Sequence, residues 1–124
     1  MRLALDRYVT LRLHIFRMQR FDRTMAALAD PTRRRLLYRL AENPCRAGAL
    51  AQGFPISRPA ISKHTRLLIR AGLIKAKKNG RERIYELAPK GGDAIKELIV
   101  ELEEVGRFWD IALDAFKRYA EKKK

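Results

Sequence analysis

The stretch between residues 57 and 83 constrains the fold of this chain most, because it joins the signals of a short helix to a basic segment that contains no acid from residue 58 to 81. Ser57 is a good helix N-cap, since its hydroxyl can accept from the free amides of the first turn. Pro59 is tolerated in that turn, and Gly72 can end the helix in a left-handed conformation. Eight basic residues and no acidic residue lie between positions 58 and 81: Arg58, Lys63, Arg66, Arg70, Lys75, Lys77, Lys78 and Arg81.

The solvent face of this helix is predicted to be wholly basic and hydroxylic. Ile61, Thr65 and Leu68 recur at spacings of four and three residues, so they form one narrow inward face. The opposite side carries Arg58, Ser62, Lys63 and Arg66. An ordinary solvated face mixes both signs of charge. A face without acids is suited to phosphates and base edges, so we predict a nucleic-acid-binding helix.

A basic β-hairpin is predicted directly after this helix. Residues 73–78 and 83–87 read as two strands, separated by the pair Asn79-Gly80. That pair favours a type I′ turn, in which both central residues need positive φ. Arg81 is expected at the tip of the hairpin, which forms the wing of a winged helix.

Two further helices are predicted before the basic helix. Asp30-Pro31 combines an N-cap acid with proline at the first helical position, and this helix should run to about Ala41. Asn43-Pro44 ends it, because a residue before proline avoids helical angles. A short helix over 47–52 and the basic helix then form the two halves of the motif.

A long helix is predicted from Asp93 to about Tyr119, after the break at residues 89–92. It carries a continuous apolar stripe and is about 40 Å long, more than one small domain can cover. Part of the stripe is therefore expected to meet another copy of the chain. The expected contact residues are Leu98, Leu102, Val105, Trp109, Leu113 and Phe116. The final Lys122-Lys123-Lys124 is expected to be a frayed tail.

The first 20 residues give a mixed signal. Val9, Leu11, Leu13 and Ile15 alternate as in a strand, but the segment also fits a helix with basic edges, which we favour. A separate short helix is expected over 21–29. The predicted organisation is thus an N-terminal extension over 1–20, a winged helix-turn-helix domain over 21–92 and a C-terminal dimerisation helix over 93–120. The fold class is mainly α with a small β-hairpin wing.

Composition narrows the classes of partner. The 124 residues carry a formal net charge of +14, which favours a polyanion such as nucleic acid or an anionic membrane surface. In the membrane alternative, residues 1–20 would lie on a bilayer as a basic amphipathic helix. No apolar run reaches the roughly 18 residues of a spanning helix. The single cysteine, Cys45, excludes an internal disulfide framework and fits a cytoplasmic protein.

Several segments together resemble the ArsR/SmtB family of bacterial and archaeal repressors. They are Ala26 to Arg34, Ala49-Leu50-Ala51, Ser57 to His64, Ala71 to Ile74 and the Gly80-Arg81 wing. Phe108-Trp109-Asp110 with Leu113 resembles a branch of that family without the usual metal sites. The resemblance implies a homodimer paired through its terminal helices, which binds a pseudo-palindromic operator and blocks transcription.

The departures from the family concern metal and packing. Metal-sensing members carry a Cys-x-Cys pair where this chain has Arg46 and Gly48, and others use a late histidine, whereas none follows His64 here. We therefore expect no metal, no cofactor and no tight zinc binding. Leucine is usual in the family where Thr65 stands, so looser packing under the basic helix is expected.

The residues expected to contact DNA are Ser57, Arg58, Ser62, Lys63, His64, Arg66, Lys78, Arg81 and Arg83. Cys45 offers one of the three or four ligands that zinc needs, so we expect a structural role, with a reactive thiol as the alternative. Phe108 and Trp109 are expected to pack in the core or in a dimer contact, with an effector pocket as the alternative. Asp110 and Asp114 lie one turn apart without a nucleophile or base beside them, so no enzyme activity is expected.

Two nucleic-acid-binding functions remain beside the membrane-surface alternative. The first is a sequence-specific, dimeric repressor of transcription that binds double-stranded DNA. The second is a non-specific architectural module that binds DNA or RNA with the same charge. A specificity ratio of roughly 10³ or more at fixed salt distinguishes the repressor from the architectural module.

Overall fold

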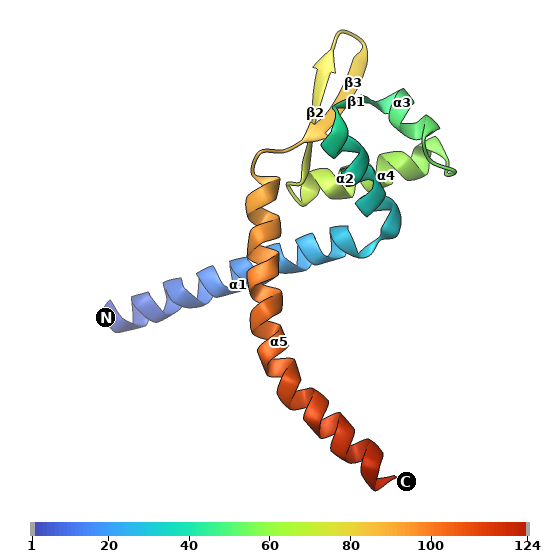
Figure 1. The fold of residues 1–124 in the computed structure, drawn as a ribbon. Coiled ribbons are helices and arrows are strands. Elements are labelled where there is room, and N and C mark those ends of the chain that lie inside the picture. Colours follow the sequence, from blue (N-terminus) through green and yellow to red (C-terminus); the bar gives the residue numbers. More distant parts are fainter. Residues whose placement is uncertain (1, 124) are drawn as a thin grey trace.

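The computed structural model describes residues 2–123, which form five helices and three strands (Figure 1). In chain order these elements are α1 (Arg2–Ala29), α2 (Pro31–Glu42), β1 (Cys45–Arg46), α3 (Ala47–Gln52), α4 (Arg58–Arg70), β2 (Ile74–Asn79), β3 (Glu82–Leu87) and α5 (Gly91–Lys122). The prediction of a mainly α chain with a β-hairpin wing is confirmed.

The ends of α2 and α4 follow the predicted capping chemistry. Asp30 is the N-cap of α2, and its Oδ2 accepts from the Arg33 backbone N at 3.0 Å. Ser57 caps α4 in the same way, since its Oγ accepts from the Ala60 backbone N at 3.3 Å. Gly72 follows the end of α4 with a φ of 74°, so the predicted left-handed stop is confirmed.

The wing has one strand more than predicted. The strands are antiparallel in the order β1-β3-β2, and the short strand β1 pairs Cys45 with Tyr85 and Arg46 with Ile84. A two-residue strand is too short to show any period-2 pattern. It exists because the free edge of β3 offers hydrogen-bonding groups to the segment between α2 and α3.

The turn of the wing differs from the predicted type I′ turn. Asn79 pairs with Glu82, so Asn79 is the last residue of β2 and the turn consists of Gly80 and Arg81. Gly80 has a φ of 67°, and no described residue other than a glycine has positive φ. The prediction of positive φ at Asn79 is therefore wrong: the register moves the turn by one residue, and glycine takes the strained first position at no steric cost. Arg81 lies at the tip as predicted.

The terminal helices are longer than predicted. Residues 2–29 form one continuous helix, so the helix favoured for the N-terminal extension is confirmed, but it is not separate from the helix expected over 21–29. Helix α5 begins at Gly91, two residues before Asp93. Lys122 is its last residue, so this lysine is not part of a frayed tail, and Lys124 lies outside the described residues.

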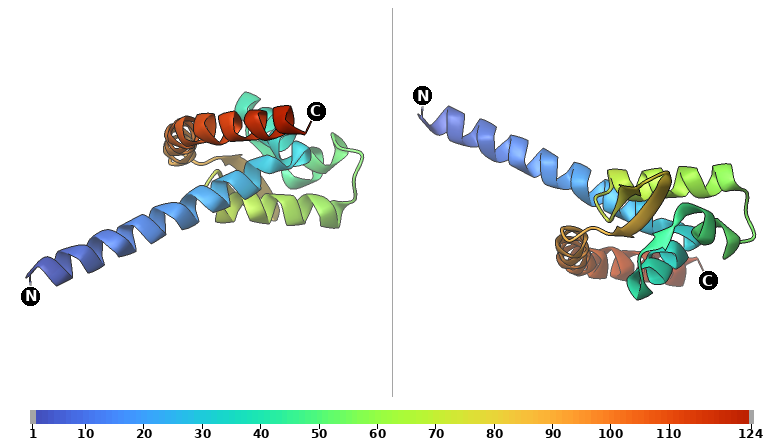
Figure 2. Two further views of the ribbon diagram at one scale, coloured as in Figure 1. Left: turned by 90° about the horizontal axis from the view of Figure 1, so that it is seen from below. Right: turned by 90° about the horizontal axis from the view of Figure 1, so that it is seen from above.

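The core lies between α2, α3, α4 and the sheet. Its fully buried side chains include Leu36, Leu50, Leu68 and Ile74. Ala94 and Leu98 from the first turns of α5 are also buried, and α5 crosses α1 beside this domain (Figure 1). The N-terminal half of α1 stands clear of the winged domain in every view (Figures 1 and 2), and the C-terminal half of α5 leads away from it in Figure 1.

Candidate nucleic-acid interface

Helix α4 separates its side chains onto two faces, as its spacing predicts. Ile61, Thr65 and Leu68 are buried against the domain. Ser57, just before the helix, is exposed, and so are the predicted contact residues Arg58, Ser62, Lys63 and Arg66. The exposed face therefore presents cations and hydroxyl groups with no acidic side chain among them.

The buried Thr65 is satisfied although it stands where leucine is usual. Its hydroxyl donates to the Ser62 backbone oxygen at 3.0 Å and lies 3.5 Å from the Tyr85 hydroxyl. Tyr85 is a buried residue of β3, so this polar contact ties the underside of α4 to the sheet. None of the buried side-chain polar atoms of the described residues lacks a hydrogen-bond partner.

The wing carries two groups of cations with different surroundings. Lys78 and Arg83 are exposed and lie directly opposite each other in the β2–β3 register, next to Arg81 at the tip. Lys75 and Lys77 instead pair with Glu86, with Nζ–Oε1 distances of 3.2 and 2.9 Å. The hydrogen bonds from Lys77 and then Lys75 hold the pKa of Glu86 below its usual value. Glu82, which lies between Arg81 and Arg83, pairs instead with Arg46 at 3.0 Å. Among the described residues, no salt bridge involves the wing cations Lys78, Arg81 and Arg83.

His64 is the one predicted contact residue that turns partly inward. Its side chain is 20% exposed, its Nδ1 lies 3.1 Å from Arg33 Nη1, and Asp30 Oδ2 is 3.9 Å away. Because arginine can only donate, the contact between these two nitrogens uses Nδ1 as its acceptor. The edge that bears Nε2 is what His64 retains for a contact with DNA.

Arg33 is a site residue that sequence reasoning missed. Its Nε donates to the Ala27 carbonyl and its Nη2 to the Ala26 carbonyl, both at 2.8 Å, while Nη1 reaches His64. One guanidinium therefore caps the C-terminus of α1 and contacts the basic helix. Three consecutive arginines at 33–35 give no signal that separates this partly buried arginine from its two exposed neighbours.

The net charge of α5 is opposite in sign to that of the rest of the chain. Helix α5 contains eight of the 14 acidic residues: Asp93, Glu97, Glu101, Glu103, Glu104, Asp110, Asp114 and Glu121. It contains five of the 28 Lys and Arg residues, so its net charge is −3 and the rest of the chain carries +17. The positive potential is thus concentrated away from α5, on the part of the chain that contains α4 and the wing.

Most of the predicted dimerisation stripe is uncovered in a single chain. Leu98 is 6% exposed and belongs to the core of its own domain, but Leu102 is 42% exposed and Phe116 is 64% exposed. Val105, Trp109 and Leu113 are exposed between them. The apolar residues of the N-terminal half of α1 are also exposed: Leu3, Leu5, Tyr8, Val9, Leu11, Leu13, Ile15, Phe16 and Met18. Exposed apolar surface this long marks an interaction site.

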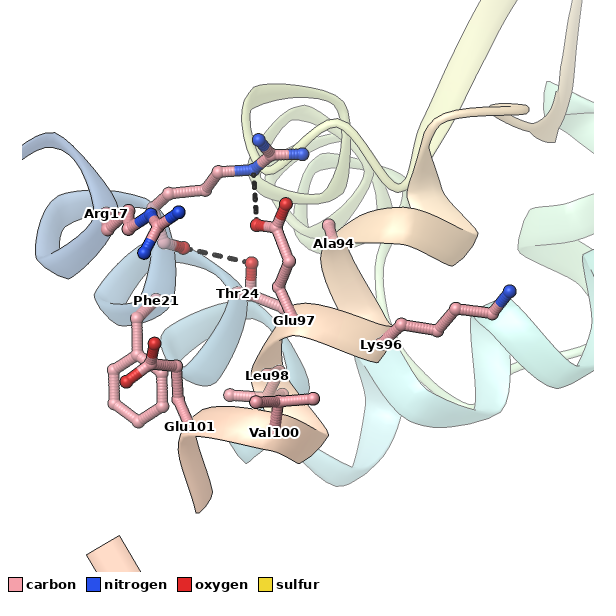
Figure 3. Close-up of a pocket in the computed structure, with 10 residues that line it drawn as sticks. Arg17, Phe21, Thr24, Ala94, Lys96, Glu97, Leu98, Val100 and Glu101 are labelled. Carbon is pink, nitrogen blue, oxygen red and sulfur yellow. Dashed lines mark hydrogen bonds and ion pairs between the residues drawn. The ribbon is translucent and has the colours of Figure 1, made fainter. Parts of the chain in front are cut away.

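Side-chain contacts hold α1 and α5 together where the two helices cross (Figure 3). Arg20 Nε pairs with Glu97 Oε2 at 3.3 Å, and the Thr24 hydroxyl donates to the Arg20 carbonyl at 3.0 Å. Phe21 and Leu98 project into the same crossing. A cavity of about 300 Å³ lies among these side chains.

Two further expectations concern residues outside the basic face. Cys45 is buried at 4% exposure in the core beside Tyr85, in line with a structural role. Among residues 2–123, no three His, Cys, Asp or Glu side chains come close enough to hold a metal ion. No helix in the same range is long and apolar enough to cross a membrane.

The chain is similar to known regulatory proteins in sequence and structure. Residues 30–76 match the model described as bacterial regulatory protein, arsR family. The HTH-type transcriptional regulator Rv2034 of Mycobacterium tuberculosis is 40% identical over 95 residues, which cover 77% of this chain and 83% of that protein. The transcriptional repressor SdpR of Bacillus subtilis is 39% identical over 61 residues, 49% of this chain and 68% of that protein. A solved ArsR-like transcriptional regulator from Rhodococcus sp. RHA1 has a TM-score of 0.61 and 35% identity, covering 83% of this chain and 94% of that chain.

Proposed function

The chain belongs to the ArsR family of bacterial regulatory proteins, and from this premise we propose that it is a homodimeric repressor that binds a pseudo-palindromic operator in double-stranded DNA. The proposal rests above all on the exposed face of α4, which presents Arg58, Ser62, Lys63 and Arg66 and no acid. As a regulator that works on DNA, it would act in the cytoplasm.

The first turns of α4 are proposed to read bases. A recognition helix enters the major groove with its N-terminal residues against the base edges. Arg58, Ser62 and Lys63 occupy these turns and are exposed. Arginine and lysine prefer the acceptors of guanine, and serine can bond to any base. Ser57 caps the helix at the same end, so its backbone lies close to the same contacts.

The flank of α4 and the wing are proposed to hold phosphates. Arg66 lies further along the helix, and Lys78, Arg81 and Arg83 surround the tip of the wing. His64 is proposed to add a phosphate contact through its Nε2–H. Such contacts fix the register of the protein on the duplex but carry no sequence information.

A second copy of the chain is the proposed cover for the exposed apolar stripe of α5. Leu102, Val105, Trp109, Leu113 and Phe116 continue along the helix beyond the winged domain, where nothing in the same chain covers them. A two-fold dimer would also place two copies of α4 on half-sites about one helical turn of DNA apart, which explains an operator with two-fold symmetry.

Two alanine variants test the assignment of base and phosphate contacts. The operator is first recovered by sequencing the genomic fragments that the purified full chain retains. Binding of Lys63→Ala and Arg81→Ala is then measured on operator and random DNA across a salt series. Lys63→Ala should cost roughly 1–3 kcal/mol on the operator and much less on random DNA. Arg81→Ala should weaken both DNAs alike and lower the salt slope by about one unit.

Lys117→Ala is the matched control, because Lys117 is exposed on α5, far from α4 and the wing. It should change neither affinity by more than a small factor. An equal loss on both DNAs for Lys63→Ala would refute the placement of α4 in the major groove. A wild-type specificity ratio near one would refute the repressor and support the architectural module.

A further inference from the structure

A second concave site lies on the described part of the chain, away from the basic face. We call it the hinge groove; its walls include Leu37, Tyr38, Leu73, Leu87, Gly92 and Ile95. Its volume is about 440 Å³. Small-molecule sites in proteins typically measure about 300–1,000 Å³ and have mostly apolar walls. The hinge groove fits both criteria.

The hinge groove lies between the winged domain and the start of α5. Leu73 directly follows Gly72 at the end of α4, and Leu87 is the last residue of β3. The Ala88 backbone N donates to the Leu73 carbonyl at 3.0 Å, and the Gly91 backbone N donates to the Ala88 carbonyl at 2.9 Å. A molecule in the groove therefore contacts Leu73 just after α4, Leu87 at the end of β3 and the first turns of α5 at the same time.

The opening of the groove is apolar with a cation at its rim. Tyr38 is 70% exposed and Leu87 is 41% exposed, which are high values for large apolar side chains. The described hydrogen bonds of Arg34 go from Nη1 to the carbonyls of Leu28 and Ala29, at 2.7 and 3.0 Å. Its Nε and Nη2 therefore keep donors for an anion. No Asp or Glu is among the residues that line the groove.

Two adjacent glycines, Gly91 and Gly92, lie along one edge of the groove, and only Gly91 is closely packed. Glycine is favoured at position 91, because an added Cβ would lie 3.1 Å from the Leu73 Cα and carbonyl oxygen. Gly92 has no such constraint, since a Cβ there would meet no atom within 4 Å. A side chain added at Gly92 would therefore extend into open space at the lining of the groove.

We propose that the hinge groove binds a small apolar acid, with its hydrocarbon or aromatic body against the apolar walls and its carboxylate at Arg34, and that this binding changes the affinity for the operator. The regulatory half rests on the proposed DNA-binding function; the binding half does not. A ligand changes operator affinity if it favours one angle between the winged domain and α5 over another.

Octanoate, with 1-octanol as its uncharged counterpart, is the probe for the binding half. Calorimetric titration of the full-length protein should give one saturable octanoate site per chain and at least tenfold weaker binding of 1-octanol. Ala41→Leu and Gly92→Leu add side chains to the groove lining from two different helices, α2 and α5, and each should weaken octanoate binding at least tenfold. Ala115→Leu makes the same change as Ala41→Leu at an exposed site of α5 and should bind as the wild type does.

Thermal melting checks that each variant is folded. Two blocking variants on different helices are used so that the test still stands if one of them does not fold. Equal octanoate binding by all four proteins overturns the site. Equal affinity for octanoate and 1-octanol overturns the proposal that the groove binds an acid through its carboxylate. If the groove is instead covered by a second chain, octanoate fails to bind at any concentration that leaves the oligomer intact, and this also overturns the proposal.

Anisotropy of a labelled operator fragment tests the regulatory half. Saturating octanoate should change the operator affinity of the wild type and Ala115→Leu by about 5- to 150-fold, the usual range of allosteric coupling. It should leave Ala41→Leu and Gly92→Leu unchanged. Bound octanoate without any change in operator affinity overturns the regulatory half alone. A failure of the ligand-free protein to prefer its operator refutes the repressor and leaves the binding result standing.

Discussion

The adjacent glycines at the start of α5 offer a sharp test of packing, because only one of them is in close contact. An added Cβ on Gly91 would lie 3.1 Å from Leu73 Cα, 3.1 Å from Leu73 O and 3.3 Å from Gly72 O, all of them backbone atoms. Ordinary contacts between carbon atoms are about 3.5–4.0 Å. Since backbone atoms cannot swing aside, the chain itself has to move to admit the methyl group.

The size of the effect follows from two opposing terms. Overpacking of a well-packed site costs about 1–3 kcal/mol. Replacing glycine by alanine at a compatible position stabilises by about 0.4–1 kcal/mol, chiefly by restricting the unfolded chain. We therefore expect Gly91→Ala to lower the free energy of unfolding by about 1–2 kcal/mol. Gly92→Ala gains the second term without the first and should raise it by up to about 1 kcal/mol.

Urea denaturation followed by circular dichroism measures both variants. All samples need the same protomer concentration, because the stability of a dimer depends on it. The two variants share the helix, the turn and the chemical change, so their difference isolates the contact with Leu73 and Gly72. Equal stability of the two variants would refute this account of why Gly91 is glycine.

Three further outcomes are expected. Sedimentation equilibrium at micromolar concentration should show a dimer, and Trp109→Ala, which trims an exposed ring of the apolar stripe, should weaken the dimer by at least tenfold; a single 14.4 kDa wild-type species contradicts this. Ser57→Ala should lower stability by about 1 kcal/mol in the same urea assay, whereas Ser57→Asp, which keeps a cap, should not. The hydrogen bond from the Arg33 backbone N holds the pKa of Asp30 below its ordinary value, so its stabilisation is complete above about pH 4 and is lost as the pH falls below that. Asp30→Asn should flatten this acid-side slope, and an unchanged slope would exclude Asp30 as its source.

The elements that sequence predicted well are those governed by local chemistry. The cap of α4 at Ser57, the stop at Gly72 and the inward set of Ile61 and Leu68 depend on neighbours within one or two turns. The same holds for Asp30-Pro31 at the start of α2. Residues this close in sequence decide the local conformation before any distant contact forms.

The features that sequence could not predict depend on distant contacts. Strand β1 exists only because β3 lies beside it, about 40 residues further along the chain. The clamp of Arg33 on His64 joins residues 31 positions apart. The position of the wing turn is set by the pairing of Asn79 with Glu82, which the dipeptide Asn-Gly alone does not reveal.

The N-terminal half of α1 was ambiguous for a different reason. Apolar side chains occupy more than one side of this helix, including Val9, Leu11, Leu13 and Ile15, so neither period dominates. A helix that is apolar around much of its circumference is normally buried by neighbours. In a single chain these residues are exposed, so the pattern in the sequence reflects surfaces that one chain does not contain.

The uneven distribution of charge has a consequence for the purified protein in solution. With −3 on α5 and +17 on the rest, the acidic helix of one molecule attracts the basic face of another. Such a contact joins two different surfaces, so it forms a ring where the rotation between molecules closes and an open chain of molecules where it does not. Salt screens the attraction, and a bound duplex occupies the basic face. Turbidity should therefore appear when the protein is dialysed to low ionic strength, and it should clear when either salt or short duplex DNA is added.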